Sequence, residues 1–477
     1  ANVALPYMQG SLSATLDQIN WVLTSYIVAA AIMTPVTGWL SDRIGRRELF
    51  LTSIVGFTIT SMLCGLAWNL EAMVTFRLLQ GVFGAAIVPL SQTILLDINP
   101  RERQGSAMAI WGAGIMVGPI IGPTLGGWLT EAANWRWVFF INLPVGILAL
   151  TGIMLFLSEK KASWQKPFDF LGFASLALAI GAIQMMLDRG PGEDWFDSAE
   201  IQIYALLFAA SIWVFAIQIM TARHPFIDLA ILKDFNFMTA TLLGFFVGIL
   251  MFGVMGLLPI LMQSLLGYPA SYAGLVSMPR GTGTFLSMLM VGQLMMFVNV
   301  RILLATGLCL LGGSLWVMTS YNLSMDSRLL EITGLMSGIG GGLVFVPLST
   351  IAFSTISPNL RAEAAGFYTL IRNIGSSVGI SIMQAYMVSN MAAARSAMLE
   401  NVRPDNPIFQ SYYPSLFNDH AALSRFSAEV SRQAMMMSYV QTFTVLFLLA
   451  VCCLPLILIL RAPRHISRSR DLHAVVD

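Results

Sequence analysis

Long apolar segments follow one another along the whole chain, and they decide what it can fold into. A helix that crosses the hydrocarbon core of a bilayer needs about 20 mostly apolar residues. Charged residues make up 11% of this chain and its mean hydropathy is +0.74, whereas soluble domains carry about 25% charged residues. The sequence therefore predicts an all-α polytopic membrane protein. The predicted spans are residues 18–40, 48–67, 71–95, 105–129, 138–158, 167–187, 199–221, 236–264, 270–296, 302–320, 329–353, 362–388 and 436–460.

The first residues indicate one more span. The segment 1–8 has the character of the last turns of a helix that begins before Ala1, so we expect fourteen spans with the first incomplete. The net charge of +1 gives no indication of a nucleic-acid partner. The four cysteines lie in apolar runs, without the spacing of a zinc site or a disulfide framework. We therefore expect no metal and no cofactor.

Lys and Arg are unevenly distributed between the loops. The short loops on the side of residues 41–47 hold more Lys and Arg than those on the opposite side, where the loop 188–198 is acidic. Short loops rich in Lys and Arg stay in the cytoplasm. We therefore expect residues 41–47 and both chain termini to be cytoplasmic.

Two stretches that lie 258 residues apart match without a gap, at residues 84–109 and 342–367. The match offsets the spans by eight, an even number, so both copies have the same orientation, as in transporters built from parallel halves. Chance agreement between small membrane residues is the alternative. The identical pairs include Gly84/Gly342, Pro89/Pro347, Leu90/Leu348, Ser91/Ser349, Pro100/Pro358, Arg103/Arg361 and Ala107/Ala365.

This repeat predicts two parallel six-helix bundles with two extra helices inserted between them. We expect the N-terminal bundle at residues 1–158, the inserted helices at 167–221 and the C-terminal bundle at 236–460. The C-terminal bundle would carry an external loop at 389–434, with an amphipathic helix in its second part, and a cytoplasmic tail would follow at 461–477.

The segment GWLSDRIGRR, residues 38–47, lies in a predicted cytoplasmic turn. Gly38 permits close helix contact, Asp42 suits a helix N-terminus, and the basic residues can pair with Asp97 or Glu102. Such a cluster would be a latch that holds helix ends together; a basic loop that only follows the charge rule is the alternative. Because the second-half counterpart, residues 292–301, has lost its acid, we expect the latch to rest on the first half. The predicted latch residues are Gly38, Asp42, Arg43, Gly45, Arg46, Arg47 and Asp97.

One span concentrates glycine and proline at intervals of four residues, so each type lines one face of a helix. Small residues let helices approach closely in lipid, and proline removes a backbone hydrogen bond, so the helix can bend. We expect this span to pack closely on its glycine face and to bend as the halves rock; a purely structural, closely packed helix is the alternative. The predicted hinge residues are Gly114, Gly118, Pro119, Gly122, Pro123, Gly126 and Gly127.

Three arginines lie inside predicted spans, namely Arg77, Arg280 and Arg372. A charge is costly inside a bilayer, so each is a hypothesis for a functional site that faces a cavity. For Arg77 the alternative is snorkelling to the membrane interface, and for Arg280 and Arg372 it is structural hydrogen bonding to carbonyl groups. We expect a substrate cavity that includes Gln80, Arg280, Arg372 and Asn373.

Several of these motifs resemble those of one transporter family. Residues 38–47 resemble the signature loop of the major facilitator superfamily, and residues 114–127 resemble the antiporter signature of proton-driven drug exporters. The segment from Arg77 to Gly84 is similar to the family's motif R-x-x-Q-G-x-x-G, whose arginine is implicated in proton handling. Nearly the whole chain resembles the fourteen-span drug:proton antiporters, and within them the EmrB-type branch. Segments that carry this likeness include residues 135–146, 186–201 and 224–237.

The resemblance also implies how protons are coupled to transport. No Asp or Glu lies deep in the predicted spans, and Arg cannot release its proton. Residues 2–6 resemble the end of the family's motif D-x-T-x-x-N-V-A-L-P, so we expect the coupling carboxylate before Ala1 and Asn2 beside the substrate cavity. Asp188 is the second candidate, with a solvated loop residue as its alternative.

The resemblance implies a proton-driven secondary exporter of hydrophobic and amphipathic drugs in the bacterial inner membrane, a cause of antibiotic resistance. As part of a tripartite pump it would work with an EmrA-like periplasmic adaptor and a TolC-type outer-membrane channel, with loop 389–434 as the adaptor contact or simply a solvated connection. The alternative function is export of a specific metabolite such as a siderophore, fatty acid or peptide, whose anion Arg280 and Arg372 would meet. No Ser/His/Asp set or metal cluster favours an enzyme.

Overall fold

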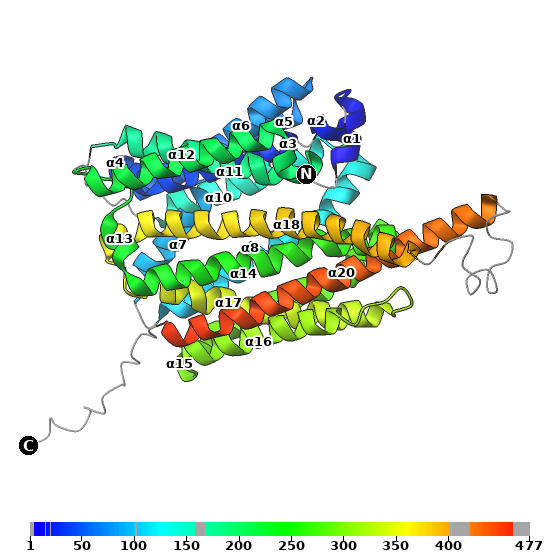
Figure 1. The fold of residues 1–477 in the computed structure, drawn as a ribbon. Helices are drawn as coiled ribbons and strands as arrows, with labels where there is room; N and C mark the ends of the chain where they lie inside the picture. The colour runs from blue at the N-terminus through cyan, green and yellow to red at the C-terminus, as the bar shows by residue number, and fades with distance from the viewer. Residues whose placement is uncertain are drawn as a thin grey trace, which may run out of the picture.

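The computed structural model describes residues 4–14, 16–19, 21–100, 103–157, 167–400, 402 and 420–460. In this part of the chain the regular structure is helical, without a β-strand, and the long helices run roughly side by side (Figure 1). Asn2, Glu102 and the predicted tail at 461–477 lie outside the described residues.

Ten helical segments in the described ranges are long and apolar enough to cross a membrane. Long helices also cover the other predicted spans at 105–129, 270–296 and 362–388. The N-terminal helices are α1 (Leu5–Ser11), α2 (Leu16–Ile19), α3 (Trp21–Met33), η2 (Thr34–Val36), α4 (Thr37–Ile44), α5 (Arg46–Gly65), α6 (Leu70–Gly84), α7 (Ile87–Ile98), α8 (Gln104–Ala132), α9 (Trp137–Phe140) and α10 (Asn142–Phe156).

Two long helices, α11 and α12, follow, and the second matches its predicted bounds. The helices between the N-terminal set and the C-terminal set are α11 (Phe170–Arg189), η4 (Gly190–Gly192), η5 (Trp195–Asp197), α12 (Ala199–Thr221) and α13 (Leu229–Lys233). The C-terminal helices are α14 (Phe235–Ile260), the π-helical turn η6 (Leu261–Leu265), α15 (Ala270–Phe297), α16 (Val300–Met318), α17 (Ser327–Ser354), η7 (Pro358–Leu360), α18 (Arg361–Leu399) and α20 (His420–Ile459).

Polar side chains fix where several of these helices begin. Asn69 accepts a hydrogen bond from the backbone N–H of Ala72 at the start of α6, at 2.8 Å. Asp234 accepts one from the N–H of Phe237 at the start of α14, also at 2.8 Å. These N-caps satisfy backbone donors that the first helical turn leaves unpaired, so the apolar segments begin at defined residues.

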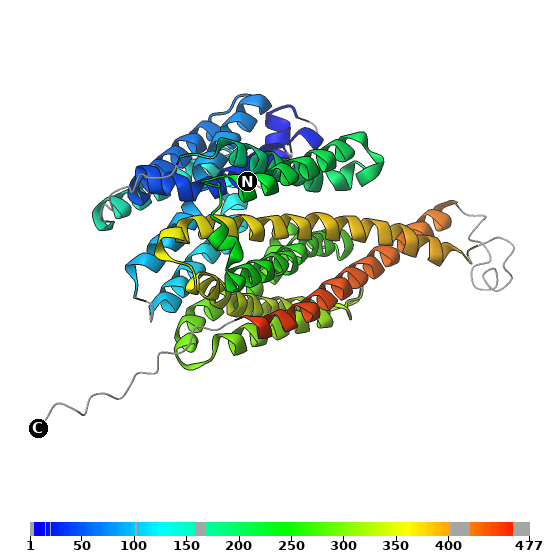
Figure 2. The ribbon, with the colours of Figure 1, turned by 60° about the vertical axis from the view of Figure 1, so that its left-hand side comes forward.

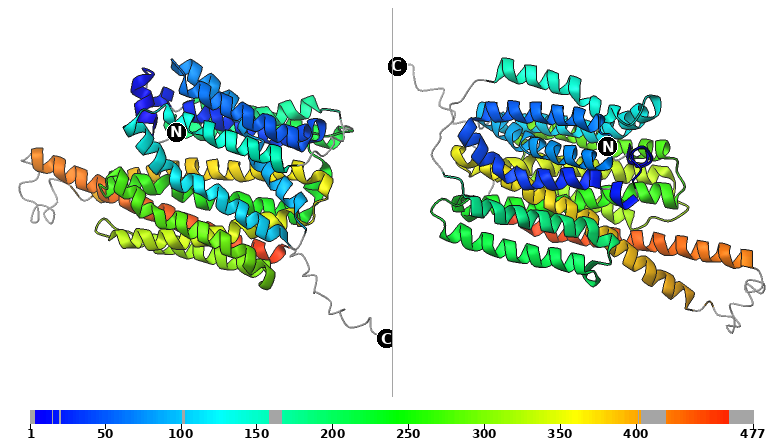
Figure 3. Two further views of the ribbon diagram at one scale, coloured as in Figure 1. Left: turned by 180° about the vertical axis from the view of Figure 1, so that it is seen from behind. Right: turned by 90° about the horizontal axis from the view of Figure 1, so that it is seen from above.

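The helices pack in two groups that meet on a few helices. Among the N-terminal helices, α3 and α5 pack on α6, and the inserted helix α11 packs on α3 and on α12. Among the C-terminal helices, α15 and α16 pack on α17, and α14 and α20 pack on α18. Contacts between the groups are made by α8 with α15 and α17, and by α4 and α7 with α18. Figure 3 shows this arrangement from two further sides.

The two copies of the repeat form matching structures. Residues 84–109 contain α7 followed by α8, and residues 342–367 contain the end of α17 followed, after the turn η7, by α18. In each copy, one helix ends shortly before the shared proline, Pro100 or Pro358, and the next begins shortly after it, at Gln104 in α8 and at Arg361 in α18.

The predicted external loop at 389–434 is wrong in its described parts. Helix α18 continues to Leu399 and α20 begins at His420, so both helices extend beyond the others as a two-helix arm (Figure 2). Residues 389–399 contain no Gly or Pro, and their Ala, Met and Arg residues favour helix. Helix α18 therefore continues beyond the end of the apolar segment. The predicted helix in the second part of 389–434 is confirmed.

The predicted close packing of the glycine face on α8 is wrong for this conformation. Among the described residues, a Cβ atom added at any of its four spaced glycines would meet no atom outside its own helix within 4 Å. Earlier in the helix, a Cβ at Gly112 would lie 3.1 Å from the sulfur of Met288 on α15. Helix α8 thus contacts α15 closely near its start and leaves the later glycines open. These are Gly114, Gly118, Gly122 and Gly126.

Of the other predicted hinge residues, Gly127 is half-buried on α8. The side chains of Pro119 and Pro123 lie outside the described residues, although the backbone of α8 is helical through both positions.

Candidate transport site and gate

The loop motif lies at one end of the long helices, which we call the motif end and define by residues 38–47. Helices α4 and α5 are separated by Gly45 alone, and its φ of 91° is a backbone conformation that favours glycine. The turn brings Arg46 to Asp97, at the end of α7, and the two form an ion pair. The predicted pairing of Arg46 with Asp97 is confirmed.

Asp97 also contacts a C-terminal helix. Its Oδ1 lies 3.2 Å from Nη1 of Arg361, the first residue of α18, and the two side chains are only 11% and 9% exposed. Removing one partner of a buried ion pair leaves an uncompensated charge, which is strongly destabilising. The expectation that the latch rests on first-half residues alone is therefore wrong, because α18 supplies a second cation.

Helices α4 and α18 also approach closely at this end. A Cβ atom added at Gly38 would lie 2.7 Å from the Cα of Glu363, so only glycine fits there without a shift. The Glu363 carboxylate accepts a hydrogen bond from the backbone N–H of Asp228, just before α13. The segment that leads out of the inserted helices therefore joins the same contact region.

The remaining residues of the motif have other contacts. Arg43 lies over the ring of Trp39, with its guanidinium carbon 4.9 Å from the ring centroid. Arg47 forms an ion pair with Glu48 at 3.5 Å. Asp42 is half-buried in the last turn of α4.

A second contact between the two groups of helices lies along α8 and α15. The Ser106 hydroxyl donates to the carbonyl oxygen of Gly292 at 3.3 Å, and a Cβ atom added at Gly292 would lie 2.7 Å from the Cβ of Ala109. The motif end is thus closed by small residues on this side and by ion pairs on the other.

Arg77 is buried inside the N-terminal helices. Its Nε donates to the carbonyl oxygen of Val22 on α3 at 2.8 Å, and its Nη1 donates to Oε1 of Gln80 at 2.7 Å. The guanidinium also lies over the ring of Tyr26, at 4.5 Å, and the residue is 8% exposed. Arg77 therefore does not snorkel to the surface: its charge is held inside by a carbonyl, an amide and an aromatic face.

Asp188 lies at the end of α11, where it contacts α3. Its Oδ2 accepts a hydrogen bond from the Thr24 hydroxyl at 2.5 Å, although Asp188 itself is exposed. The hydrogen bond links an inserted helix to the same helix whose Val22 carbonyl binds Arg77.

Arg280 and Arg372 belong to the C-terminal helices. Arg280 on α15 donates from Nη2 to the carbonyl oxygen of Met251 on α14, at 2.6 Å, which agrees with structural hydrogen bonding. Arg372 on α18 lies over the ring of Phe345, at 5.0 Å, and its neighbour Asn373 is exposed. The contacts given by the structure bring neither arginine to Gln80, which lies with Arg77.

Two residues of the closed end were missed by the sequence analysis, Arg361 and Glu363. Arg361 occupies the repeat position of Arg103, so a signal was present. Its partner Asp97 is 264 residues away, and only the packing of α7 on α18 reveals the pair.

The comparisons with known proteins agree with this architecture. A family model for the Major Facilitator Superfamily matches residues 1–380. The crystal structure of the human organic anion transporter MFSD10 (TETRAN) has a TM-score of 0.59 at 15% identity, covering 94% of this chain and 88% of that chain, which supports the fold. The chain belongs to the major facilitator superfamily, and it is a multi-pass membrane transporter rather than an enzyme.

Relatives with higher identity narrow the class. The chain is 34% identical over 435 residues to the Multidrug export protein EmrB of Haemophilus influenzae, covering 91% of this chain and 85% of that protein. It is 33% identical over 418 residues to the Multidrug export protein EmrB of Escherichia coli (strain K12), covering 87% and 82%. It is also 32% identical over 474 residues to the Fatty acid resistance protein FarB of Neisseria gonorrhoeae, covering 98% and 93%. Within the superfamily, the chain is therefore similar to drug exporters of the EmrB type.

Proposed function

We propose that this chain is a proton-driven secondary exporter of hydrophobic and amphipathic drugs in the bacterial inner membrane. The likeness to EmrB proteins supports the substrate class. The observation that carries the transport mechanism is the ion pair between Asp97 and Arg361, because it joins an N-terminal helix to a C-terminal helix at one end of the bundle. A transporter of two halves opens its site to one side at a time, and such a pair would form and break in each cycle.

The two halves in this mechanism are residues 1–158 and 236–460, with the inserted helices at 167–221 between them. In the present conformation the motif end is closed, while the glycine face of α8 is open farther along the helix. We infer that the rocking motion opens the ion pairs at the motif end and closes α8 against its neighbours on that glycine face. The hinge role of these residues is part of this proposal.

Arg77 supplies the buried cation for proton coupling. Because Arg keeps its proton, a carboxylate must carry the transported proton, and a neighbouring cation stabilises the ionised form of that carboxylate. Within the chain, our candidate carboxylate is Asp188, supported by its hydrogen bond to α3 through Thr24.

The drug would bind between the halves, with Arg280, Arg372 and Asn373 as candidate contacts from the C-terminal half and Gln80, which accepts a hydrogen bond from Arg77, as the candidate from the N-terminal half. Gln80 lies on α6 and Arg280 and Arg372 lie on α15 and α18, so residues from both halves would face the ligand. The Nη1 atom of Arg372 is buried without a hydrogen-bond partner in the described part of the chain.

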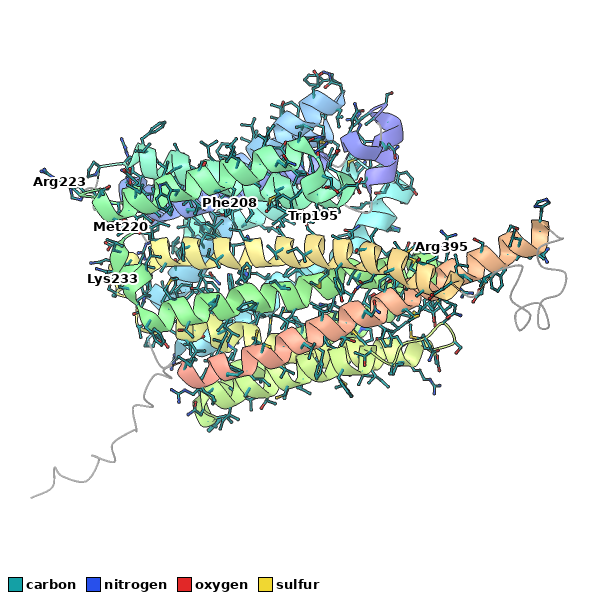
Figure 4. The ribbon with its side chains drawn as sticks, viewed as in Figure 1. Trp195, Phe208, Met220, Arg223, Lys233 and Arg395 are labelled. Atoms are coloured by element: carbon teal, nitrogen blue, oxygen red, sulfur yellow. The ribbon has the colours of Figure 1, made fainter. Side chains whose placement is uncertain are left out.

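We infer that the motif end and both termini are cytoplasmic and that the two-helix arm lies in the periplasm; the distribution of Lys and Arg between the loops supports this orientation. Arg395 on α18 donates to the Ser427 hydroxyl on α20 at 3.2 Å and ties the two arm helices together (Figure 4). The arm is our candidate contact for an EmrA-like adaptor, which would connect to a TolC-type channel. Deleting residues 389–434 should reduce recovery of such an adaptor in co-purification, and unchanged recovery would count against docking there.

Export of a specific metabolite, such as a siderophore, fatty acid or peptide, is the second candidate function. The 32% identity to FarB over nearly the whole chain supports a fatty acid. The two functions differ in breadth of substrate, so they are separated by testing several unrelated drugs beside one candidate acid.

Transport in proteoliposomes tests the main proposal. An imposed pH gradient should drive ethidium against its concentration gradient, and nigericin, which collapses the pH gradient, should stop it. Transport that is indifferent to nigericin, or absent for every drug tried, would contradict proton-driven drug export.

A further inference from the structure

We propose that Arg372, together with the aromatic pair Phe345 and Trp111, binds the carboxylate of amphipathic organic acids. The inference rests on the proposed exporter function and names a substrate class for it. It starts from a difference between the three arginines that lie inside membrane-spanning helices.

Arg77 and Arg280 both donate to carbonyl oxygens, whereas Arg372 has no such bond to any residue that the structure describes. The Nη1 atom of Arg372 is buried and has no hydrogen-bond partner, and within the described part of the chain no carboxylate pairs with it. A buried charged donor without a partner is costly. The guanidinium of Arg372 therefore lacks a hydrogen-bond acceptor, and a bound ligand can supply one.

The ring of Phe345 interacts with only one face of the Arg372 guanidinium. It lies 5.0 Å from the guanidinium carbon, and a ring face attracts a cation placed over it. The N–H groups of a guanidinium point outward in its own plane, however, and this planar fork matches the two oxygens of a carboxylate. An anion can therefore bind at the edge of Arg372 without displacing Phe345.

The aromatic pair continues from Phe345 into the other half of the protein. The ring of Trp111 on α8 stacks on Phe345 with the centroids 6.1 Å apart and 19° between the planes. The indole N–H of Trp111 donates to the Ser91 hydroxyl on α7 at 2.9 Å, which fixes the ring. Both rings are half-buried, so an apolar ligand body bound to Arg372 would pack against the indole of Trp111 and the edge of Phe345.

The position along the membrane also fits a transported ligand. Arg372 is eleven residues into α18, which at about 1.5 Å per residue places it about 16 Å from the helix start. Half of the hydrocarbon thickness is about 15 Å. The residue is half-buried and its neighbour Asn373 is exposed, so the site lies near the midplane and is not sealed.

Equilibrium binding to the full chain in lipid nanodiscs tests this assignment. The probes are naphthalene-1-acetate and its neutral amide, which share the ring system and differ in charge. We expect the wild-type protein to bind the acid at least tenfold more tightly than the amide. Arg372→Gln should remove that preference, and Arg372→Lys should retain part of it, because an ammonium group keeps the charge without the planar fork.

Two further variants keep the test decisive. Arg136→Gln is the control, and it should retain the preference because Arg136 lies outside the proposed site and donates to the carbonyl oxygens of Gly65 and Ala67. If Arg372→Gln is not recovered folded, Phe345→Leu takes its place and should weaken both probes alike while the acid preference remains. Equal affinity of the wild-type protein for both probes, or a full preference in Arg372→Gln, would overturn the assignment.

Ethidium export by the wild-type protein separates this inference from the proposed function. Ethidium export by a protein that binds both probes equally would contradict only the proposed carboxylate site. If the protein prefers the acid but exports no drug, the carboxylate site is supported and the proposed drug-export function is contradicted.

Discussion

Asp97 on α7 and Arg361 on α18 are 264 residues apart in the sequence and form an ion pair with 3.2 Å between Oδ1 and Nη1. Arg46 binds the same carboxylate through Oδ2. One buried acid thus holds a cation from its own half and a cation from the other half. The closed motif end depends on this shared charge.

The first prediction concerns that charge. Asp97→Asn leaves Arg46 and Arg361 without their counter-ion, so we expect the motif end to open more often. Removing one partner of a buried pair costs about 3–5 kcal/mol, and about 1.4 kcal/mol already changes a population tenfold. The native cysteines, Cys64, Cys309, Cys452 and Cys453, are first replaced. Maleimide labelling is then measured at Ala109→Cys, at a buried position on α8. We expect Asp97→Asn to raise the labelling rate about tenfold.

The matched control for this variant is Glu48→Gln. Glu48 pairs with Arg47 but is 51% exposed, and exposed pairs contribute at most about 1 kcal/mol. Labelling should stay near the wild-type rate. Equal labelling in Asp97→Asn and Glu48→Gln would contradict a latch at Asp97.

The second prediction concerns the approach of α4 to α18. Gly38→Val places a side chain where a Cβ would already lie 2.7 Å from Glu363, so the motif end can no longer close. We expect ethidium transport to fall at least about tenfold, on the reasoning that a rigid contact this short cannot be accommodated without movement. Gly152→Val on α10 is the control, because a Cβ there meets nothing within 4 Å. Equal transport by the two variants would refute the close-contact argument.

The third prediction concerns Arg77. Arg77→Lys keeps the charge but loses the geometry that reaches both Val22 and Gln80, and Arg77→Gln loses the charge as well. We expect gradient-driven ethidium transport to fall several-fold in the first variant and to be abolished in the second. Ethidium binding without a gradient should change less than transport. A variant Arg77→Gln that still accumulates ethidium against a gradient would exclude Arg77 from proton coupling.

The fourth prediction concerns the open glycine face of α8. A Cβ atom added at Gly118 would meet no described atom outside its own helix within 4 Å, and leucine favours helix over glycine by roughly 1 kcal/mol. The protein should therefore melt at or above the wild-type temperature. If the face closes during transport, the same variant should transport at less than about a tenth of the wild-type rate, because an added side chain obstructs close helix packing. Wild-type transport would show that this face stays open throughout the cycle.

The sequence predicted the spans well because apolar length and flanking polar residues determine them. The predicted span 199–221 has the same bounds as α12. The extension of α18 to Leu399 was missed because hydropathy marks where a helix leaves the membrane, whereas helix propensity decides where it ends. The site was only partly predictable: the pairing of Arg46 with Asp97 follows from a local charge pattern, but Arg361 depends on packing between distant helices.

The glycine face shows a different limit of sequence reasoning. Its period of four residues predicts one face of a helix, and the helix is present. The period carries no information about which conformation brings that face into contact. A transporter has at least two conformations, and the same sequence must be compatible with both of them.

Spin-label distances at both ends of the protein test the central claim, that two halves rock about a site between them. Labels at Glu48 and Lys233 report on the motif end (Figure 4 marks Lys233), and labels at Leu66 and Tyr272 report on the opposite end; all four residues are exposed. When Asp97→Asn is introduced in nanodiscs, we predict a longer Glu48–Lys233 distance together with a shorter Leu66–Tyr272 distance. Distances that both lengthen, or an opening at the motif end with no change at the other, would contradict the account.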